Sequence, residues 1–154
     1  PTARFATARP CATRRRSGVG RALVLCRVKK NKRWVWIALC RRTRQIVAYF
    51  IGGRTEEDCW RLWSWIPRSY RHCATFSDFW ETYDTVFGHL ATEHHSVGKE
   101  TGETAHVERW NNTLRQRLAR FVRKTLSFSK SDEFHEIALR RFIHEYNQTQ
   151  SVTA

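Results

Sequence analysis

Residues 33–51 read RWVWIALCRRTRQIVAYFI, and this stretch is the strongest indication of the fold class. Its first part, residues 33–40, is an apolar run rich in aromatic and β-branched residues, and it is short enough to be a strand buried on both faces. The polar residues 41–44 follow as a turn, and residues 45–51 repeat the strand pattern until two glycines stop it. We therefore predict two adjacent antiparallel strands.

Helix and strand patterns alternate after this pair. Thr55 is the expected N-cap of a helix of about three turns, which ends at Pro67. Its apolar face is expected to hold Trp60, Trp63 and Ile66. The order expected for the chain is strand, strand, helix, strand, helix, strand, helix, helix, which is a mixed α/β arrangement.

The middle of the chain places a carboxylate at the end of a short strand. Residues 73–76 are apolar and are followed by Ser77 and Asp78, after which a helix is expected to about Leu90. A brief strand is expected around residues 95–97. Asp78 is therefore predicted to lie at a strand end.

Two amphipathic helices are expected in the last third. The first spans about residues 103–124, and its apolar positions are Val107, Trp110, Leu114, Leu118 and Phe121. Its polar side has Glu108, Asn112 and Arg115 at i, i+4 and i+7, so these three share one ridge. Ser129 or Ser131 is expected to cap the second helix, whose predicted apolar face consists of Phe134, Ile137, Ala138, Phe142 and Tyr146.

Composition indicates one domain and a polyanionic partner. The 154 residues are 41% hydrophobic and carry a formal net charge of +14, which favours nucleic acid as the partner; solubility of a Trp-rich domain is the alternative explanation. The five cysteines have no zinc or disulfide spacing, so we expect buried thiols. No apolar run is long enough for a membrane span, and we expect a cytoplasmic, nucleoid-associated protein.

Two acids are candidates for metal chemistry. Asp78 and Glu108 are separated by 29 residues, and they converge if the long helix packs on the sheet. Paired carboxylates bind the two Mg²⁺ ions that phosphodiester chemistry uses. The pairing alone is weak evidence, because the chain has 14 acids and most acids lie on a solvated surface.

Three strings resemble one family. They are KNKRWVWIALCRRTRQIVAYFIG at residues 30–52, SDFW at 77–80, and GKETGETAHVERWNNTLRQRLARFVRKTLSFSK at 98–130. Together with the apolar last helix, they resemble the insertion sequence one family of InsB-type DDE transposases over about residues 27–148.

The resemblance implies an RNase H-like mixed sheet flanked by helices, with an Asp-Asp-Glu triad that holds two Mg²⁺ ions. It implies that Asp78 and Glu108 are catalytic metal ligands, and that the substrate is double-stranded DNA at the element ends. Four more residues of the third string are expected to support the metal site and contact DNA, with a solvated helix face as the open alternative; they are Arg109, Asn112, Arg115 and Arg117. No role is assigned to His94, His95 or His106, and a homo-oligomer is left open.

The chain departs from the family pattern before residue 27. The family's first catalytic Asp lies in a strand resembling LELDELWSFV, whereas residues 14–26 read RRRSGVGRALVLC, and no acid precedes Glu56. A shift of the reading frame by one base explains the difference. Read one base later, codons that can encode residues 23–26 give Trp-Ser-Phe-Val. Codons for residues 19–22 can then give Leu-Asp-Glu-Leu, and codons for residues 14–18 can give Asp-Asp-Val-Leu-Glu. A natural basic arm that binds DNA is the alternative.

These observations predict three segments. Residues 1–26 are an out-of-frame or disordered basic segment, residues 27–148 are an RNase H-like catalytic domain with a compromised first strand, and residues 149–154 are a tail. The ancestral function is metal-dependent DNA cleavage and strand transfer. We expect little or no transposase activity here because the first catalytic Asp is absent. The alternative function is a non-enzymatic, basic DNA-binding remnant that competes with intact transposase.

Overall fold

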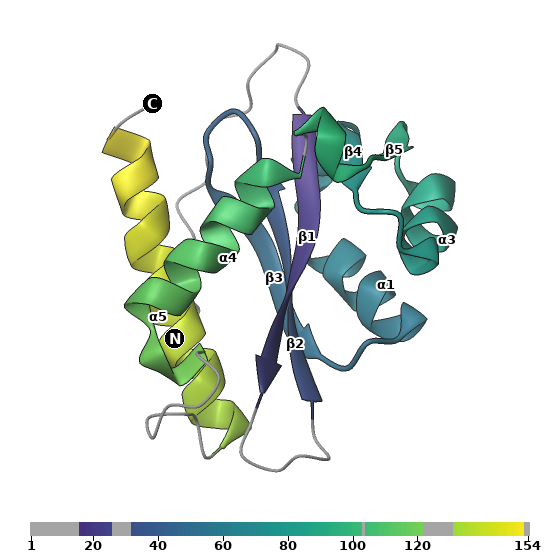
Figure 1. The fold of residues 1–154 in the computed structure, drawn as a ribbon. Helices are drawn as coiled ribbons and strands as arrows, with labels where there is room; N and C mark the ends of the chain where they lie inside the picture. Colours follow the sequence, from purple (N-terminus) through teal and green to yellow (C-terminus); the bar gives the residue numbers. More distant parts are fainter. Residues whose placement is uncertain (1–15, 26–31, 103, 122–130, 153–154) are drawn as a thin grey trace.

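A five-stranded mixed sheet lies between two pairs of longer helices (Figure 1). The computed structural model of the protein describes residues 16–25, 32–102, 104–121 and 131–152. Its strands are β1 (Arg16–Leu25), β2 (Lys32–Cys40), β3 (Ile46–Gly52), β4 (Ala74–Ser77) and β5 (His94–Ser96). The predicted strand pair at residues 33–51 is confirmed, with antiparallel pairing between β2 and β3.

The strand order is β3-β2-β1-β4-β5, which makes β1 the central strand. β1 pairs antiparallel with β2 and parallel with β4, and β5 continues the sheet parallel to β4. Residues 16–25 therefore have a place in the sheet, whereas the sequence predicted a disordered or misread segment up to residue 26. Their backbone pairs with strands on both sides, and extended backbone of almost any sequence can make such ladders.

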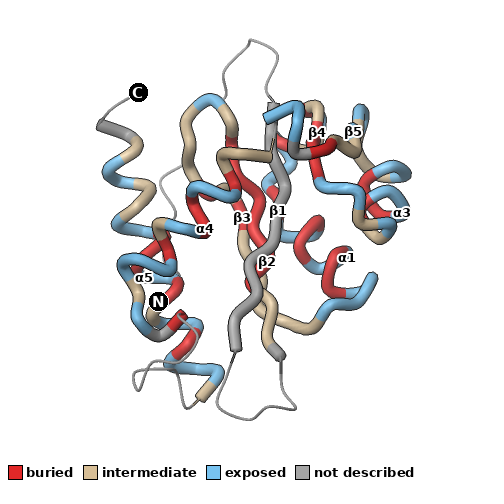
Figure 2. The backbone as a smooth tube through the Cα atoms, viewed as in Figure 1, coloured by how far each residue is buried: buried red, intermediate tan, exposed pale blue. Residues whose placement is uncertain are grey.

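β2 is buried on both faces, as its apolar run predicts. Trp36, Ala38 and Cys40 contribute to a core with α1 (Glu56–Trp65) and α3 (Glu81–Leu90). The alternate residues Val35, Ile37 and Leu39 contribute to a second core with α4 (Ala105–Arg117) and α5 (Asp132–Val152). Figure 2 shows the buried path along β2 and the inward sides of the helices.

α1 begins where its capping residues predict. Thr55 is the N-cap, and its hydroxyl and the Asp58 carboxylate form a reciprocal capping box. The predicted apolar face is wrong at one position, because Trp60 is 43% exposed and Leu62 is buried instead. A four-residue helix, α2 (Arg68–Arg71), follows Pro67 and was not predicted.

α4 keeps its predicted apolar face but ends early. Leu118 is its C-cap, and a 3₁₀ turn, η2 (Ala119–Phe121), follows. Another 3₁₀ turn, η1 (Lys99–Thr101), precedes α4. Residue 103 and residues 122–124 of the predicted helix lie outside the described residues.

The predicted apolar face of α5 is partly wrong. Phe134 and Ile137 are 62% and 54% exposed, whereas Leu139 and Ile143 are buried against the sheet. α5 is therefore rotated about its own axis by roughly one residue position relative to the predicted orientation. Ser131 caps the helix, since its hydroxyl accepts the Phe134 N–H at 3.3 Å. α5 continues through Val152, so residues 149–152 of the predicted tail are helical.

Asn147 attaches α5 to the edge strand β3. Its side-chain amide donates to Ile46 O at 2.9 Å, and its carbonyl oxygen accepts the Ile46 N–H at 2.8 Å. The Asn147 side chain thus makes the two hydrogen bonds to the Ile46 backbone that a further strand would make there. Of the five cysteines, Cys40, Cys59 and Cys73 are buried free thiols, and the other two lie outside the described residues. None of the helices in the described ranges is long and apolar enough to span a membrane.

Candidate functional site

Asp78 directly follows β4, as predicted, and its carboxylate is exposed. Its Oδ1 accepts the Trp80 N–H at 3.3 Å. The Trp80 ring is anchored against Trp36 and Tyr83, with centroid distances of 5.4 and 5.3 Å. The half-buried ring of Trp80, two residues away, therefore anchors the turn from which Asp78 reaches the surface.

Glu108 lies in the first turn of α4 and is also exposed. α4 lies against β1, and β1 is the parallel neighbour of β4. The elements that hold Asp78 and Glu108 therefore both adjoin the central strand: β4 pairs with it, and α4 packs against it (Figure 1). The described residues contain no group of three or more His, Cys, Asp or Glu side chains placed to hold a metal ion.

A third carboxylate would be expected at position 20 of β1, but this residue is a glycine. The β1/β4 pairing ends with Gly18 opposite Phe76, and continuing this register by two residues, one beyond the end of β4, would set Gly20 level with Asp78. The β1/β2 register pairs Gly20 with Ile37, which is buried in the α4/α5 core. Directly opposed residues of antiparallel strands share a face, so position 20 lies on the α4 face. A full three-carboxylate metal site therefore does not fit the residues present.

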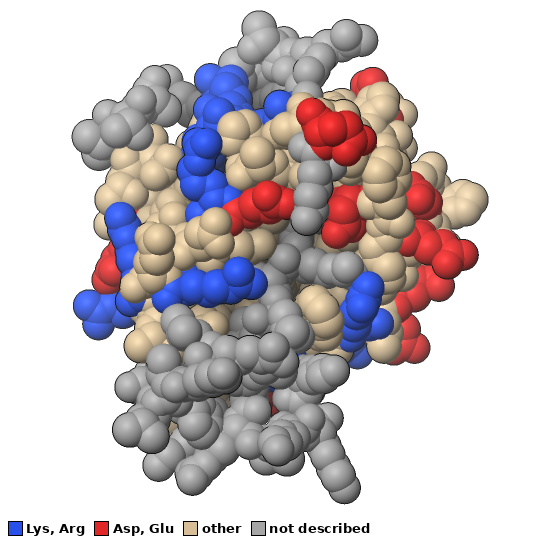
Figure 3. All heavy atoms as spheres, viewed as in Figure 1, with Lys and Arg blue, Asp and Glu red and all other residues tan. Residues whose placement is uncertain are grey.

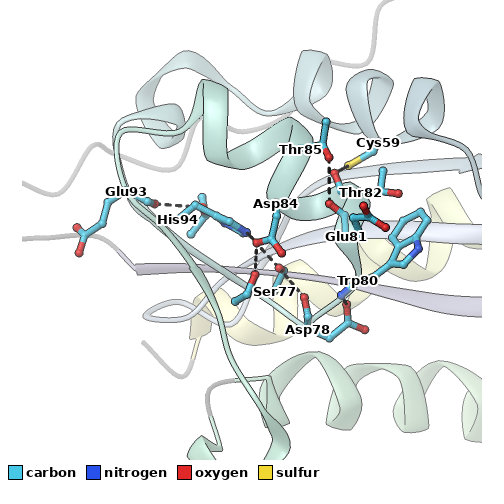
Figure 4. A network of polar contacts seen from close by, with 12 residues as sticks. Cys59, Ser77, Asp78, Trp80, Glu81, Thr82, Asp84, Thr85, Glu93 and His94 are labelled. Atoms are coloured by element: carbon cyan, nitrogen blue, oxygen red, sulfur yellow. Dashed lines mark hydrogen bonds and ion pairs between the residues drawn. The ribbon is translucent and has the colours of Figure 1, made fainter.

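A polar network supports the end of β4 (Figure 4). His94 of β5 contacts the Thr75 hydroxyl through Nδ1 at 2.8 Å and the Ser77 hydroxyl through Nε2 at 3.2 Å. Asp84 Oδ1 lies 3.6 Å from the same Nε2 and also accepts the Ser96 hydroxyl. The Ser77 hydroxyl donates to Asp78 O at 2.9 Å. The network thus links β4, β5 and α3 one residue before Asp78.

Burial lowers the pKa of His94, and the neighbouring His95 lowers it further, while the Asp84 carboxylate acts in the opposite direction. The side chain of His94 is only 5% exposed, and its ring stacks on Phe87 at 5.7 Å. The neutral imidazole is therefore the form that this environment favours. No role was predicted for His94 from the sequence, because only the pairing of β4 with β5 brings it beside Ser77 and Asp84.

The four polar residues predicted on α4 do not lie on one side of the helix. At about 100° per residue, Asn112 and Arg115 share the ridge of Glu108, as predicted. Arg109 and Arg117 are rotated by about 100° and 180° from Glu108, so they lie on another flank. All four side chains are exposed.

The positive charges of Arg109 and Arg117 act on Tyr146 of α5, with which no sequence pattern connected them. Tyr146 of α5 is half-buried, which raises its pKa, while the positive charges of Arg44, Arg117 and Arg109 act to lower it. Arg44 comes from the β2–β3 turn.

Arg44 is held in an unusual backbone conformation. Its φ is 60°, and it is the one non-glycine residue with positive φ in the described part of the chain. Hydrogen bonds of 2.8 Å from Arg44 N to Cys40 O and from Cys40 N to Gln45 O fix the turn. A left-handed conformation costs a non-glycine residue about 1–2 kcal/mol. The turn therefore keeps an arginine where a glycine would be more stable.

The fold and site define an α/β protein with two carboxylates beside a central strand and a basic helix face. A family model described as IS1 transposase matches residues 22–148. The InsB protein of insertion element iso-IS1n of Shigella dysenteriae is 35% identical over 118 residues, which cover 77% of this chain and 86% of that protein. The IS1 protein InsB of Shigella flexneri is 34% identical over 116 residues, 75% of this chain and 84% of that protein.

The chain belongs to the IS1 transposase family. The resemblance predicted over residues 27–148 is confirmed, and the match begins inside β1, five residues earlier than expected. Membership supports a function in transposition of an insertion element.

Proposed function

We propose that the chain is the catalytic-domain part of an insertion-sequence transposase with an RNase H-like arrangement, and that it binds double-stranded DNA without cutting it. The observation that carries the proposal is the register of β1. β4, which ends just before Asp78, pairs with β1, and α4, which holds Glu108, packs against it. The register of β1 and β4, continued by two residues, sets Gly20 level with Asp78.

Two independent arguments point to position 20. The strand register makes it the neighbour of Asp78 on the face covered by α4. Read one base later, codons for residues 14–26 can encode DDVLELDELWSFV. The Asp in the LELDEL part of this string falls at position 20. The agreement supports the hypothesis that a frame change removed the first carboxylate.

The family's triad implies two Mg²⁺ ions, which polarise the phosphate and activate the attacking oxygen when they are bound. This chain keeps two of the three carboxylates. Loss of one shared carboxylate removes most of the rate, because members of a catalytic set act as a unit. We therefore assign Asp78 and Glu108 to the remaining part of the metal site and assign no step of the reaction to this polypeptide.

Cleavage of labelled duplexes that carry element ends, with Mg²⁺ present, tests the proposal. The chain as it stands should release no product above background. A variant with residues 14–26 replaced by DDVLELDELWSFV should gain activity, and Asp78→Ala or Glu108→Ala in that variant should abolish the gain. Activity of the unaltered chain that disappears with Asp78→Ala would show that the site is functional and overturn the proposed inactivity.

Divalent-ion binding gives a second readout that does not depend on turnover. Mn²⁺ titration by calorimetry should show tighter binding to the Gly20→Asp variant than to the unaltered chain. Gly20→Asn is the matched control, since it adds nearly the same volume without a charge. Equal affinity of all three proteins would contradict the placement of position 20 in the metal site.

A second candidate function is a non-enzymatic remnant that competes with intact transposase for DNA. It is favoured by the basic flank of α4 and by the net charge of +14. Figure 3 shows Lys and Arg atoms mainly on the α4/α5 side of the molecule. Addition of the chain to a cleavage assay with an intact family member tests this candidate: a competitor lowers the rate of the intact enzyme, and an unchanged rate would contradict the competitor role.

A further inference from the structure

We infer that Arg54, held against the rings of Trp34 and Trp80, binds one backbone phosphate of the DNA strand that reaches Asp78. The inference rests on the proposed function, and it adds a residue that fixes the position of the DNA backbone beside the carboxylate. Arg54 lies between β3 and α1, and no sequence pattern connected it with Asp78.

The Arg54 guanidinium contacts two indole rings. Its Cζ lies 5.2 Å from the centroid of the Trp34 ring and 5.0 Å from that of the Trp80 ring. Both rings are partly buried and pack against the α1/α3 core, whereas Arg54 itself is exposed. Cation–π attraction to two fixed rings therefore restrains the end of an arginine side chain that solvent and ligands can reach.

The backbone beside Arg54 is anchored by the same core. The carbonyl oxygen of Gly53 accepts the Trp36 Nε1–H at 3.0 Å. Trp36 is fully buried, and its ring lies 5.4 Å from that of Trp80. One buried side chain thus holds both the chain next to Arg54 and a ring on which Arg54 rests. A group restrained in this way loses little freedom when it binds a ligand.

The N–H groups of Arg54 are open to a ligand. Within the described residues, no hydrogen bond or ion pair joins its guanidinium to the protein. Arg71 provides the contrast, because it also lies over an indole, that of Trp63 at 5.8 Å, but its Nε and Nη2 donate to the carbonyl oxygens of Ile66 and Ser64 at 2.8 and 2.9 Å. Arg71 therefore supports the fold, whereas the donors of Arg54 are available to an external acceptor.

The place of Arg54 next to Asp78 identifies that acceptor as a DNA phosphate. The N–H of Trp80 donates to Asp78 Oδ1 at 3.3 Å, so one residue contacts both the carboxylate and the guanidinium (Figure 4). A planar guanidinium matches two oxygens of a phosphate. Phosphates of one strand follow each other about every 3.4 Å along the duplex axis. A strand whose backbone reaches Asp78 therefore brings a neighbouring phosphate to Arg54.

Acidic residues restrict this site to one phosphate. Glu56, Glu57 and Asp58 follow Arg54 in the first turn of α1, and none of them forms an ion pair with it in the described part of the chain. Their charges oppose the attraction of a whole duplex to this side of the molecule. Arg54 thus positions a strand rather than attracting it, and its effect should depend on one particular phosphate.

A double-mutant cycle between Arg54 and the DNA backbone tests the inference. The probes are labelled duplexes of about 30 base pairs that carry an element end, each with a single neutral methylphosphonate at one of the phosphates near that end. In fluorescence anisotropy, Arg54→Gln should weaken binding of the unmodified duplex about tenfold. One methylphosphonate should weaken binding of the unaltered chain by a similar factor and leave the affinity of Arg54→Gln unchanged.

Two further variants separate geometry from charge. Arg54→Lys keeps the charge but loses the planar two-point contact, so it should recover little of the affinity. Arg68→Gln removes an exposed cation from α2, which precedes β4, whereas Asp78 follows it. Screening limits the effect of so distant a charge, which should stay below about twofold and couple to no phosphate. The thermal midpoint of both Arg54 variants should change by at most about 3 °C.

Several results would overturn the inference. Equal losses of affinity in Arg54→Gln and Arg68→Gln, or no coupling at any of the modified phosphates, would show that Arg54 acts only through net charge. Full recovery in Arg54→Lys would exclude the two-point contact. Unchanged affinity of Arg54→Gln would exclude any contact and leave the proposed function intact. If the unaltered chain binds no duplex, the proposed function itself fails, and the phosphate site fails with it.

Discussion

The two faces of the sheet share the strand β2 but differ in the chemistry that covers them. The α1/α3 face is closed by aromatic rings, and its helices begin with acidic residues. The sheet residues of the α4/α5 face are aliphatic, α4 ends with arginines, and α5 begins with acidic residues. In the view of Figure 3, Lys and Arg atoms lie mainly on the α4/α5 side, and Asp and Glu atoms lie mainly on the α1/α3 side. The two faces therefore differ in the side chains that close them and in their surface charge.

The largest expected effect comes from removing the anchor of the α1/α3 face. Trp36 is fully buried, its Nε1 donates to Gly53 O at 3.0 Å, and its ring packs on Trp80. Trp36→Ala should lower the free energy of unfolding by about 3–5 kcal/mol in urea titrations. Trp65→Ala is the control, because Trp65 is 62% exposed; a similar decrease for both would refute the importance of this core.

The next effect concerns the α4/α5 face. Asn147→Ala removes both hydrogen bonds to Ile46 and leaves a part-buried backbone donor and acceptor unpaired. The expected cost is about 1–3 kcal/mol. Gln148→Ala, at an exposed neighbouring position, should change stability by at most about 0.5 kcal/mol. Equal stabilities of the two variants would mean that Asn147 does not attach α5 to β3.

A smaller effect is expected at the start of α1. Thr55→Ala removes the capping box and should cost about 1 kcal/mol, measured by thermal unfolding. Thr113→Ala in α4 replaces a mid-helix threonine on the opposite face and should be neutral or slightly stabilising. Neither variant should alter DNA affinity of the folded protein. A change in affinity for Thr55→Ala would show that the two faces are not independent.

The smallest effect is a dependence of stability on pH. The pKa of His94 is lowered in the folded protein, so folding favours the neutral imidazole. Its contribution to stability is present above the unfolded-state pKa of about 6.5 and is lost as the pH falls below that value. His94→Gln should flatten this dependence between about pH 5 and 7. An unchanged profile would mean that other groups cause it.

Local patterns predicted most of the α1/α3 face correctly. The runs in β2 and β3, the cap at Thr55, the stop at Pro67 and the strand end before Asp78 all follow from residues close in sequence. These features depend on hydrogen bonds and backbone preferences within a few residues. Trp60 was assigned wrongly because helical periodicity does not decide which of two neighbouring apolar ridges meets the sheet.

The α4/α5 face was predicted less well, and the reason is long-range packing. Phe134 and Ile137 were expected inside, but the attachment of Asn147 to β3 sets the rotation of α5 and exposes them. Arg44 was described only as part of a polar turn. The action of its charge on Tyr146 of α5 depends on how α5 and the turn pack, which no local pattern contains.

The amino-acid order alone was enough to predict the order of most elements and the family, because these are written in local patterns and strings; it also led to the proposal of Asp78 and Glu108 as metal ligands. The packed chain was needed to show that β1 is the central strand between β2 and β4, and that His94 contacts the Ser77 hydroxyl at the end of β4. The physical reason is that strand register and helix rotation are set by interactions between residues far apart in the chain.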